Sequence, residues 1–207
     1  MKLNKNNYVI GITGGVGAGK SIILDELANT YGARVYQADR ISRSLTLRGE
    51  SAFEPVVALF GKDILMKDGN PDRSRIAQIV FNDLDKLEKL NNIIHPEVRK
   101  FLKSKAKRRD GLIILEAALP IEAGFMDICD EIWYVYATKE NRIKRVADSR
   151  GYSREKTEDI MKSQLSEKEF RDIATAVIDN NGTLLETEMQ IENLISKAID
   201  YLKIDRR

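Results

Sequence analysis

The sequence predicts an α/β fold, a doubly wound parallel sheet of five strands flanked by helices. Three observations predict this class. Short apolar runs rich in β-branched residues alternate with helical patterns along most of the chain. A glycine-rich loop of the form G-x-x-x-x-G-K-S joins the first apolar run to the first helical pattern. Two later runs have a carboxylate at their carboxyl end, where ligands bind in open α/β sheets: Asp39 comes three residues after one run, and Glu116 ends the other.

The glycine-rich loop spans Gly14 to Ser21, between a predicted strand over 8–13 and a predicted helix over 20–31. Glycines let consecutive backbone N–H groups turn toward one anion, and the helix N-terminus adds partial positive charge. The loop therefore predicts a site for nucleotide phosphates. The Lys20 ammonium is expected at the β- and γ-phosphates, and the Ser21 hydroxyl is expected to bind Mg²⁺. The strand–loop–helix context disfavours the alternative, a turn that only caps a helix.

The remaining elements of the predicted core continue the alternation of strand and helix. Asp39 follows the second strand and Glu116 ends the third, so both are expected at the sheet edge where the glycine-rich loop lies. The predicted strands are residues 33–36, 111–116, 131–137 and 176–179, and the predicted helices are 139–148 and the amphipathic 184–202.

Two stretches depart from this alternation. Residues 40–109 are helical, with Asp72 as a predicted N-cap and with an apolar periodicity that His95-Pro96 is expected to break. This stretch is predicted to be a substrate-binding insertion. From Ser153 to about Phe170 we expect one charged helix that projects from the body as a lid. The predicted organisation is a nucleotide-binding core of 1–39, 110–147 and 174–207, a helical substrate-binding domain of 40–109 and a lid of 148–173.

Composition limits the function classes. Lys and Arg number 34 against 32 Asp and Glu, a net charge of +2, which lacks the footprint of a nucleic-acid binder. The basic run at 100–109 is expected to be a solvated helix face. No apolar run approaches the roughly 18 residues of a membrane span, and the polar segment before residue 8 is not expected to be a signal peptide. We expect a cytoplasmic enzyme for a small molecule, a monomer or small homo-oligomer, with no nucleic-acid or membrane partner.

The carboxylates at the strand ends suggest phosphoryl transfer, which needs an oriented acceptor hydroxyl beside the bound phosphates. Asp39 is a candidate general base, and helix N-capping is its alternative role. Glu116 stands where a Walker-B-type carboxylate supports Mg²⁺, and its alternatives are a helix cap or an ion pair.

Charged residues in the second half of the chain have two open interpretations. Arg142, Arg145 and Arg150 border the predicted lid, where they would close over a nucleotide, or else they are solvated helix charges. His95 is the only histidine, and it is either a cap or core-edge hydrogen-bonder or a substrate contact.

Three function classes fit a glycine-rich phosphate loop: a small-molecule kinase, a regulatory GTPase and a binding module without catalysis. A GTPase needs D-x-x-G after a buried strand and an N-K-x-D motif. The evident D-x-x-G is Asp148 to Gly151, at the end of a predicted helix, and no N-K-x-D is found. Asp39 at the acceptor edge argues against a binding module. An ATP-dependent kinase is favoured.

Six ordered segments together resemble the dephospho-CoA kinase family. Residues 11–21 are similar to its G-[IL]-T-G-G-I-G-S-G-K-[ST] opening, and 37–43 to its D-A-D-x-[IV]-x-R, although Gln37 replaces the first Asp. Ile94-His95-Pro96 matches L-H-P, and 177–182 matches V-I-x-N-x-G. Phe60-Gly61 with Arg73 follows the family's order, and 116–122 stands where the family has D-[IV]-P-L-L-[FY]-E, with Glu116 for Asp. Arg150 lies one position later than the family's lid arginine.

The resemblance implies transfer of a phosphoryl group from ATP, with Mg²⁺, to the ribose 3′-hydroxyl of dephospho-CoA, giving CoA and ADP. Another small-molecule or nucleoside monophosphate kinase of this fold is the alternative. The implied catalytic residues are Asp39, as the base, and Lys20. The implied ATP-site residues are Gly14, Gly15, Val16, Gly17, Ala18, Gly19, Lys20, Ser21, Ile22, Arg145, Arg150, Asn180 and Gly182. The implied residues for dephospho-CoA are Asp39, Arg43, His95 and Glu116.

Overall fold

The computed structural model describes residues 7–108 and 110–202. The expectation about the polar segment before residue 8 therefore concerns residues that lie mostly outside the described ones, as does Arg109 at the end of the basic run. The chain forms two compact units. The first contains the chain up to Tyr36 and from Lys105 onward, and the second contains Gln37–Ser104.

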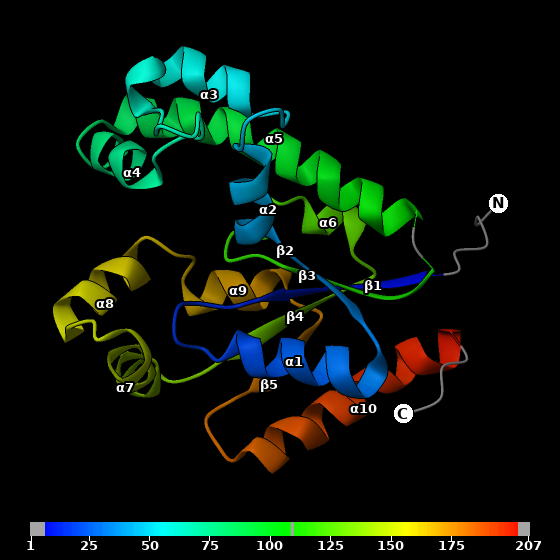
Figure 1. Cartoon of the computed structure of the whole chain (residues 1–207). Helices are drawn as coiled ribbons and strands as arrows, with labels where there is room; N and C mark the ends of the chain where they lie inside the picture. Colours follow the sequence, from blue (N-terminus) through cyan, green and yellow to red (C-terminus); the bar gives the residue numbers. More distant parts are fainter. Residues whose placement is uncertain (1–6, 109, 203–207) are drawn as a thin grey trace. The chain divides into compact units, whose positions relative to one another are not determined.

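The first unit is built on a parallel sheet with strand order β2-β3-β1-β4-β5 (Figure 1). β1 pairs in parallel with β3 and β4, and β4 pairs in parallel with β5. The predicted α/β class and the five-stranded parallel sheet are confirmed. The strands are β1 (Asn7–Thr13), β2 (Arg34–Gln37), β3 (Gly111–Glu116), β4 (Glu131–Tyr136) and β5 (Ala176–Asp179).

The central strand β1 is covered on both faces, which explains its continuous apolar run. Helices α1 (Lys20–Tyr31) and α10 (Leu184–Leu202) pack on one face (Figure 1). On the other face, a Cβ added to Gly11 would lie only 2.5 Å from Phe125 of α6 (Phe125–Ile128). The buried core on the face of α1 and α10 includes Ile10, Ile12, Ile23, Leu27, Ile114, Trp133, Ile178, Ile191 and Ile195.

Three helices lie between β4 and β5: α7 (Lys139–Arg150), α8 (Arg154–Lys162) and α9 (Glu167–Ile173). The predicted single helix from Ser153 to about Phe170 is therefore wrong. The chain turns after Lys162, and Ser166 starts α9 with a capping box, in which the side chains of Ser166 and Glu169 each bond the other's backbone N–H. Phe170 is buried and stacks on Tyr134 of β4 at 4.9 Å between ring centroids, so α9 packs on the sheet instead of projecting.

The second unit is helical, as predicted for this stretch. Its small core is formed by Val56, Ile64 and Ile76. Asp72 caps α4, because its carboxylate accepts bonds from the backbone N–H groups of Ser74 and Arg75 at 2.9 and 3.2 Å. The elements are α2 (Ala38–Leu45), α3 (Phe53–Phe60), the 3-10 turn η1 (Lys62–Ile64), α4 (Arg73–Phe81) and most of α5 (Leu84–Arg108).

The helix α5 corrects a second prediction, because it runs without a break through Pro96. Proline has no backbone N–H, so Pro96 cannot donate to the carbonyl of Asn92 one turn earlier. The loss of this hydrogen bond usually kinks or ends a helix. Both Pro96 and Asn92 are exposed, so water can satisfy that carbonyl, and burial of Val98 and Leu102 supports the helix beyond the proline. Among the described residues, no helix is both long and apolar enough to cross a membrane.

Candidate functional site

The glycine-rich loop between β1 and α1 presents a helix N-terminus without a side-chain cap. Gly19 is the N-cap of α1 in the left-handed conformation, with φ 90°, which favours glycine. No side chain caps the helix, and its first turn carries no acidic residue. The N–H groups of this turn and the positive end of the helix dipole are therefore suited to an anion.

Lys20 and Glu116 form an ion pair beside this loop. The Lys20 Nζ lies 3.6 Å from the Glu116 Oε1 and donates a hydrogen bond of 2.7 Å to the Gly14 carbonyl. Glu116 is 8% exposed and lies opposite Ile12 in the register of β3 and β1. Of the roles considered for Glu116, the structure shows the ion pair, which holds the Lys20 ammonium at the base of the loop.

Ser21 and Ile22 lie in the exposed first turn of α1, directly after Lys20. Among the described residues there is no group of three or more His, Cys, Asp or Glu side chains that could hold a metal ion. A single exposed hydroxyl at a helix N-terminus that is suited to an anion fits Mg²⁺, which keeps several waters and is bound largely through substrate phosphates.

A second set of contacts, the Ala18 cluster (Ala18, Arg145, Asn180 and Thr187), holds the loop from the C-terminal part of the chain. The Asn180 Nδ2 donates to the Ala18 carbonyl at 2.8 Å, and the Thr187 hydroxyl donates to the Asn180 Oδ1 at 3.0 Å. Arg145 donates to the carbonyls of Ala18 and Asn180 at 3.4 and 2.7 Å. Asn180 is 4% exposed, so its amide supports the loop from within the protein.

We expect Asn180→Ala to lower the free energy of unfolding by about 1–3 kcal/mol, because buried bonding partners at Ala18 and Thr187 lose a hydrogen bond. For a chain of this size, each kcal/mol shifts Tm by roughly 2–4 °C. Calorimetry measures the shift, and Asn193→Ala, at an exposed position of α10, is the matched control. Equal Tm values for the two variants would contradict a supporting role for Asn180.

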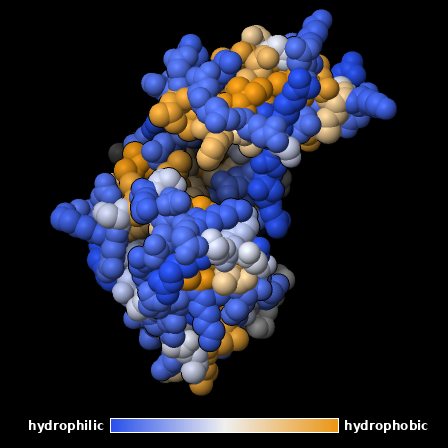
Figure 2. Space-filling view, turned by 90° about the vertical axis from the view of Figure 1, so that its left-hand side faces the viewer, coloured by the Kyte–Doolittle hydropathy of each residue, from blue (hydrophilic) through white to orange (hydrophobic). Residues whose placement is uncertain are grey.

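In the second unit, a cavity of about 210 Å³ brings two arginines together with apolar side chains. Burial and the nearby charge of Arg43 lower the pKa of the Arg73 guanidinium, and the Asp39 carboxylate opposes that shift, so the three charges are neighbours. Figure 2 shows apolar side chains at the surface of this unit, in the upper part of the view. The lining residues are Ser42, Arg43, Thr46, Val56, Arg73, Ile76, Ala77, Val80, Leu90 and Ile94.

Asp39 is exposed in the first turn of α2, where Gln37 occupies the N-cap position without a side-chain capping bond. The capping alternative for Asp39 is therefore not what the structure shows.

His95 follows Ile94 of the cavity wall and is partly buried. Arg150 is the exposed last residue of α7, and Gly182 is exposed in the turn before α10. Among the described residues, no hydrogen bond or ion pair joins Arg150 or His95 to the glycine-rich loop or to the residues that line the cavity.

The structure draws into these groups two residues, Arg73 and Gln164, to which the sequence analysis gave no site role, and a third, Arg142, whose role it left open. Arg73 shares the cavity with Arg43, and its only signal was its place in the family-like order of segments. Arg142 and Gln164 both contact Val16 of the glycine-rich loop. Arg142 was one of three arginines with an open interpretation, and no pattern marked Gln164.

Comparison with known proteins gives a consistent result. The family model described as dephospho-CoA kinase matches residues 8–186. A dephospho-CoA kinase of Carboxydothermus hydrogenoformans is 37% identical over 193 residues, 91% of this chain and 93% of the relative. The crystal structure of TT1252 from Thermus thermophilus is 31% identical with a TM-score of 0.79, covering 93% of this chain and 98% of that one.

A solved dephospho-CoA kinase from Campylobacter jejuni is 21% identical, with a TM-score of 0.66 over 92% of this chain and 96% of that one, and it shares the fold. The family match covers the glycine-rich loop, both carboxylates and the Asn180 turn. This chain belongs to the dephospho-CoA kinase family and has the P-loop kinase fold.

Proposed function

We propose that this kinase transfers the γ-phosphoryl group of ATP to the ribose 3′-hydroxyl of dephospho-CoA, which gives CoA and ADP. The observation that carries the donor half is the Lys20 ammonium, held 3.6 Å from Glu116 at the base of an uncapped glycine-rich helix N-terminus. Such a loop cradles phosphates with backbone N–H groups, and a cation beside it stabilises the charge of the moving group.

For the donor, Lys20 contacts the β- and γ-phosphates, and the segment from Gly14 to Ile22 surrounds the phosphate chain. Not every N–H group of this segment faces ATP, because those of Val16, Ala18 and Ile22 are bonded within the protein. Arg145 and Asn180 hold the Ala18 carbonyl, which supports the loop geometry. Arg150 and Gly182 stay predictions for ATP contacts, as does the role of residues 148–173 as a lid.

Mg²⁺ fits the exposed Ser21 hydroxyl, next in sequence to Lys20, which is paired with Glu116 at the end of β3. When bound, the ion supplies charge neutralisation on the phosphate oxygens. Glu116 then keeps Lys20 oriented, because its carboxylate is anchored at the end of a buried strand.

For the acceptor, we assign Asp39 as the base that accepts the proton of the 3′-hydroxyl. Arg43 and Arg73 border the cavity of the second unit, where two guanidinium groups suit an anionic substrate with phosphate groups. His95 is a substrate contact in this proposal. The enzyme acts in the cytoplasm as a monomer or small homo-oligomer.

An ADP-release assay over four acceptors tests this assignment against another small-molecule kinase of the fold. Dephospho-CoA, AMP, CMP and shikimate are compared at equal ATP and Mg²⁺. We expect kcat/KM for dephospho-CoA to exceed the other values by orders of magnitude, because sites that bond a substrate's polar groups reject analogues that lack them. A preference for any other acceptor would overturn the substrate and leave the fold unaffected.

A further inference from the structure

Both backbone groups of Val16, in the middle of the glycine-rich loop, are bound by side chains that are distant in sequence, one from α7 and one from the turn after α8. The Gln164 Oε1 accepts from the Val16 N–H at 2.9 Å. The Arg142 Nε donates to the Val16 carbonyl at 2.8 Å, and its Nη2 donates to the Gln164 Oε1 at 3.3 Å. The three residues, here the Val16 cluster, form a closed ring of hydrogen bonds that fixes both ends of one loop residue.

Gly15 provides independent support for this arrangement. A Cβ at Gly15 would overlap the Arg142 Nη2 and would lie 3.0 Å from the Gln164 Oε1. Gly15 is not among the glycines with a left-handed backbone, so conformational freedom does not explain its presence. The space above Gly15 is taken by the side chains of the Val16 cluster, so any larger residue at this position would displace them.

The environment strengthens these bonds. Burial lowers the pKa of the Arg142 guanidinium, so Arg142 is not a solvated helix charge, as one interpretation of the sequence had it. Hydrogen bonds of a charged donor in such a partly desolvated place are stronger than those at an open surface.

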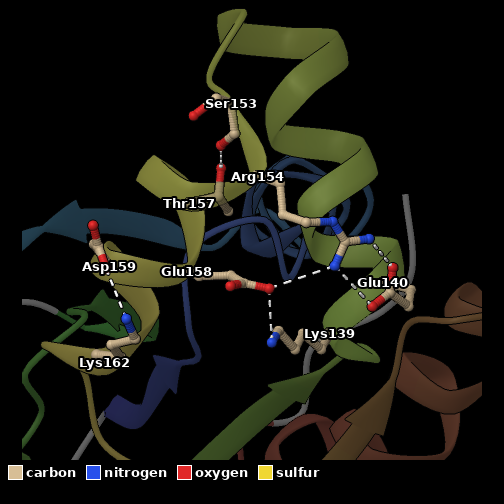
Figure 3. A network of polar contacts seen from close by, with 8 residues as sticks. All are labelled: Lys139, Glu140, Ser153, Arg154, Thr157, Glu158, Asp159 and Lys162. Atoms are coloured by element: carbon tan, nitrogen blue, oxygen red, sulfur yellow. Dashed lines mark hydrogen bonds and ion pairs between the residues drawn. The ribbon is translucent and has the colours of Figure 1, made fainter.

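Arg142 lies in α7 and Gln164 in the turn after α8, and an ion-pair network joins α8 to the start of α7 (Figure 3). Arg154 binds both carboxylate oxygens of Glu140, at 3.2 and 2.5 Å. Glu158 contacts Arg154 at 3.4 Å and Lys139 at 2.8 Å. Single exposed pairs contribute little, but this network links α8, which ends two residues before Gln164, to the helix that carries Arg142.

We propose that Arg142 and Gln164 are positioning residues that orient the phosphate-binding loop through Val16. The bonded N–H belongs to the peptide group between Gly15 and Val16, and the bonded carbonyl belongs to the one between Val16 and Gly17. Both peptide groups around the Val16 Cα are therefore restrained, so the following N–H groups keep their direction toward the phosphates of ATP. The position of α7 and α8 thereby determines how well the loop binds ATP. This inference rests on the proposed ATP site at the loop.

Steady-state kinetics of Gln164→Ala, Gly15→Ala and Gln164→Glu test the proposal. Gln164→Ala removes the acceptor, and Gly15→Ala displaces the cluster without removing either side chain. We expect both to raise the KM for ATP about tenfold, the usual value of one or two lost hydrogen bonds, with the KM for dephospho-CoA changed by less than about twofold. Gln164→Glu keeps an oxygen acceptor for Val16 and Arg142 and is expected to restore the wild-type KM for ATP.

Ser163→Ala and Lys144→Ala are the matched controls, since both residues are exposed neighbours on the same elements. Amide hydrogen exchange adds a direct readout, because the Val16 N–H loses protection in Gln164→Ala and keeps it in Gln164→Glu. An unchanged KM for ATP, an equal rise in both KM values, or no rescue by Gln164→Glu would overturn the proposal. Failure of the proposed function would look different from failure of this inference, because the wild-type enzyme would then not phosphorylate dephospho-CoA at all.

Discussion

Replacing Lys20 with alanine is expected to reduce kcat by at least about 10²–10³-fold, since one group aimed at developing charge contributes that much in other enzymes. The physical reason is the placement of its ammonium, bonded to the Gly14 carbonyl and 3.6 Å from Glu116. This position at the start of α1 is where phosphate charge would accumulate. Coupled-enzyme kinetics at saturating ATP and dephospho-CoA measure the loss.

Two comparisons make the Lys20→Ala result specific. Lys144→Ala removes a positive charge from an exposed position of α7 and should retain the wild-type kcat. Thermal unfolding of Lys20→Ala shows whether the fold survives the loss of the Glu116 ion pair. A folded Lys20→Ala enzyme with near-wild-type kcat would remove Lys20 from the catalytic site.

Asp39→Asn is expected to lower kcat by about 10²–10⁴-fold, the usual contribution of a general base, and to leave ATP binding unchanged. Asparagine preserves the shape of the side chain but cannot accept the proton of the 3′-hydroxyl. Asp39 is exposed in the first turn of α2 and close enough to Arg73 to affect its pKa, so it is available to a substrate in the second unit. Single-turnover kinetics, with calorimetric titration of ATP, separate the two effects.

Asp85→Asn serves as the control for Asp39→Asn, because Asp85 is an exposed carboxylate of the same unit, paired with Lys89 on α5. A rise in the KM for dephospho-CoA at constant kcat would show that Asp39 binds the acceptor without activating it. Such a split would overturn the assignment of Asp39 as the base.

The sheet and the glycine-rich loop between β1 and α1 could be predicted because their signals are local. The strand β1 is an unbroken apolar run since both its faces are buried, and a glycine-rich loop must follow it if backbone N–H groups are to meet phosphates. Asp39 and Glu116 were selected as candidates by their positions at the carboxyl ends of strands, and their roles stay predictions. The break between α8 and α9 also had a local signal, Ser166 followed by Glu169 at capping-box spacing, but the charge pattern around it suggested one helix.

Other features depend on tertiary structure and could not be predicted in this way. Packing beyond Pro96 carries α5 past a residue that usually ends a helix. The Val16 cluster joins residues separated by 126 and 148 positions, and no periodicity or motif spacing indicates such a pairing. Arg73 belongs to the cavity only because α4 and α2 both border it.

The contacts that complete the glycine-rich loop have a consequence for synthesis of the protein. The loop is made first, but its partner Asn180 follows Ala18 by 162 residues, and Gln164 follows Val16 by 148. Contacts of such separation form late, because the intervening chain must be made and ordered first. ATP stabilises only the form that binds it, so a nascent chain gains no support from ATP until β5 and α10 have been made. Most of the polypeptide must therefore fold on its own core before the nucleotide can contribute.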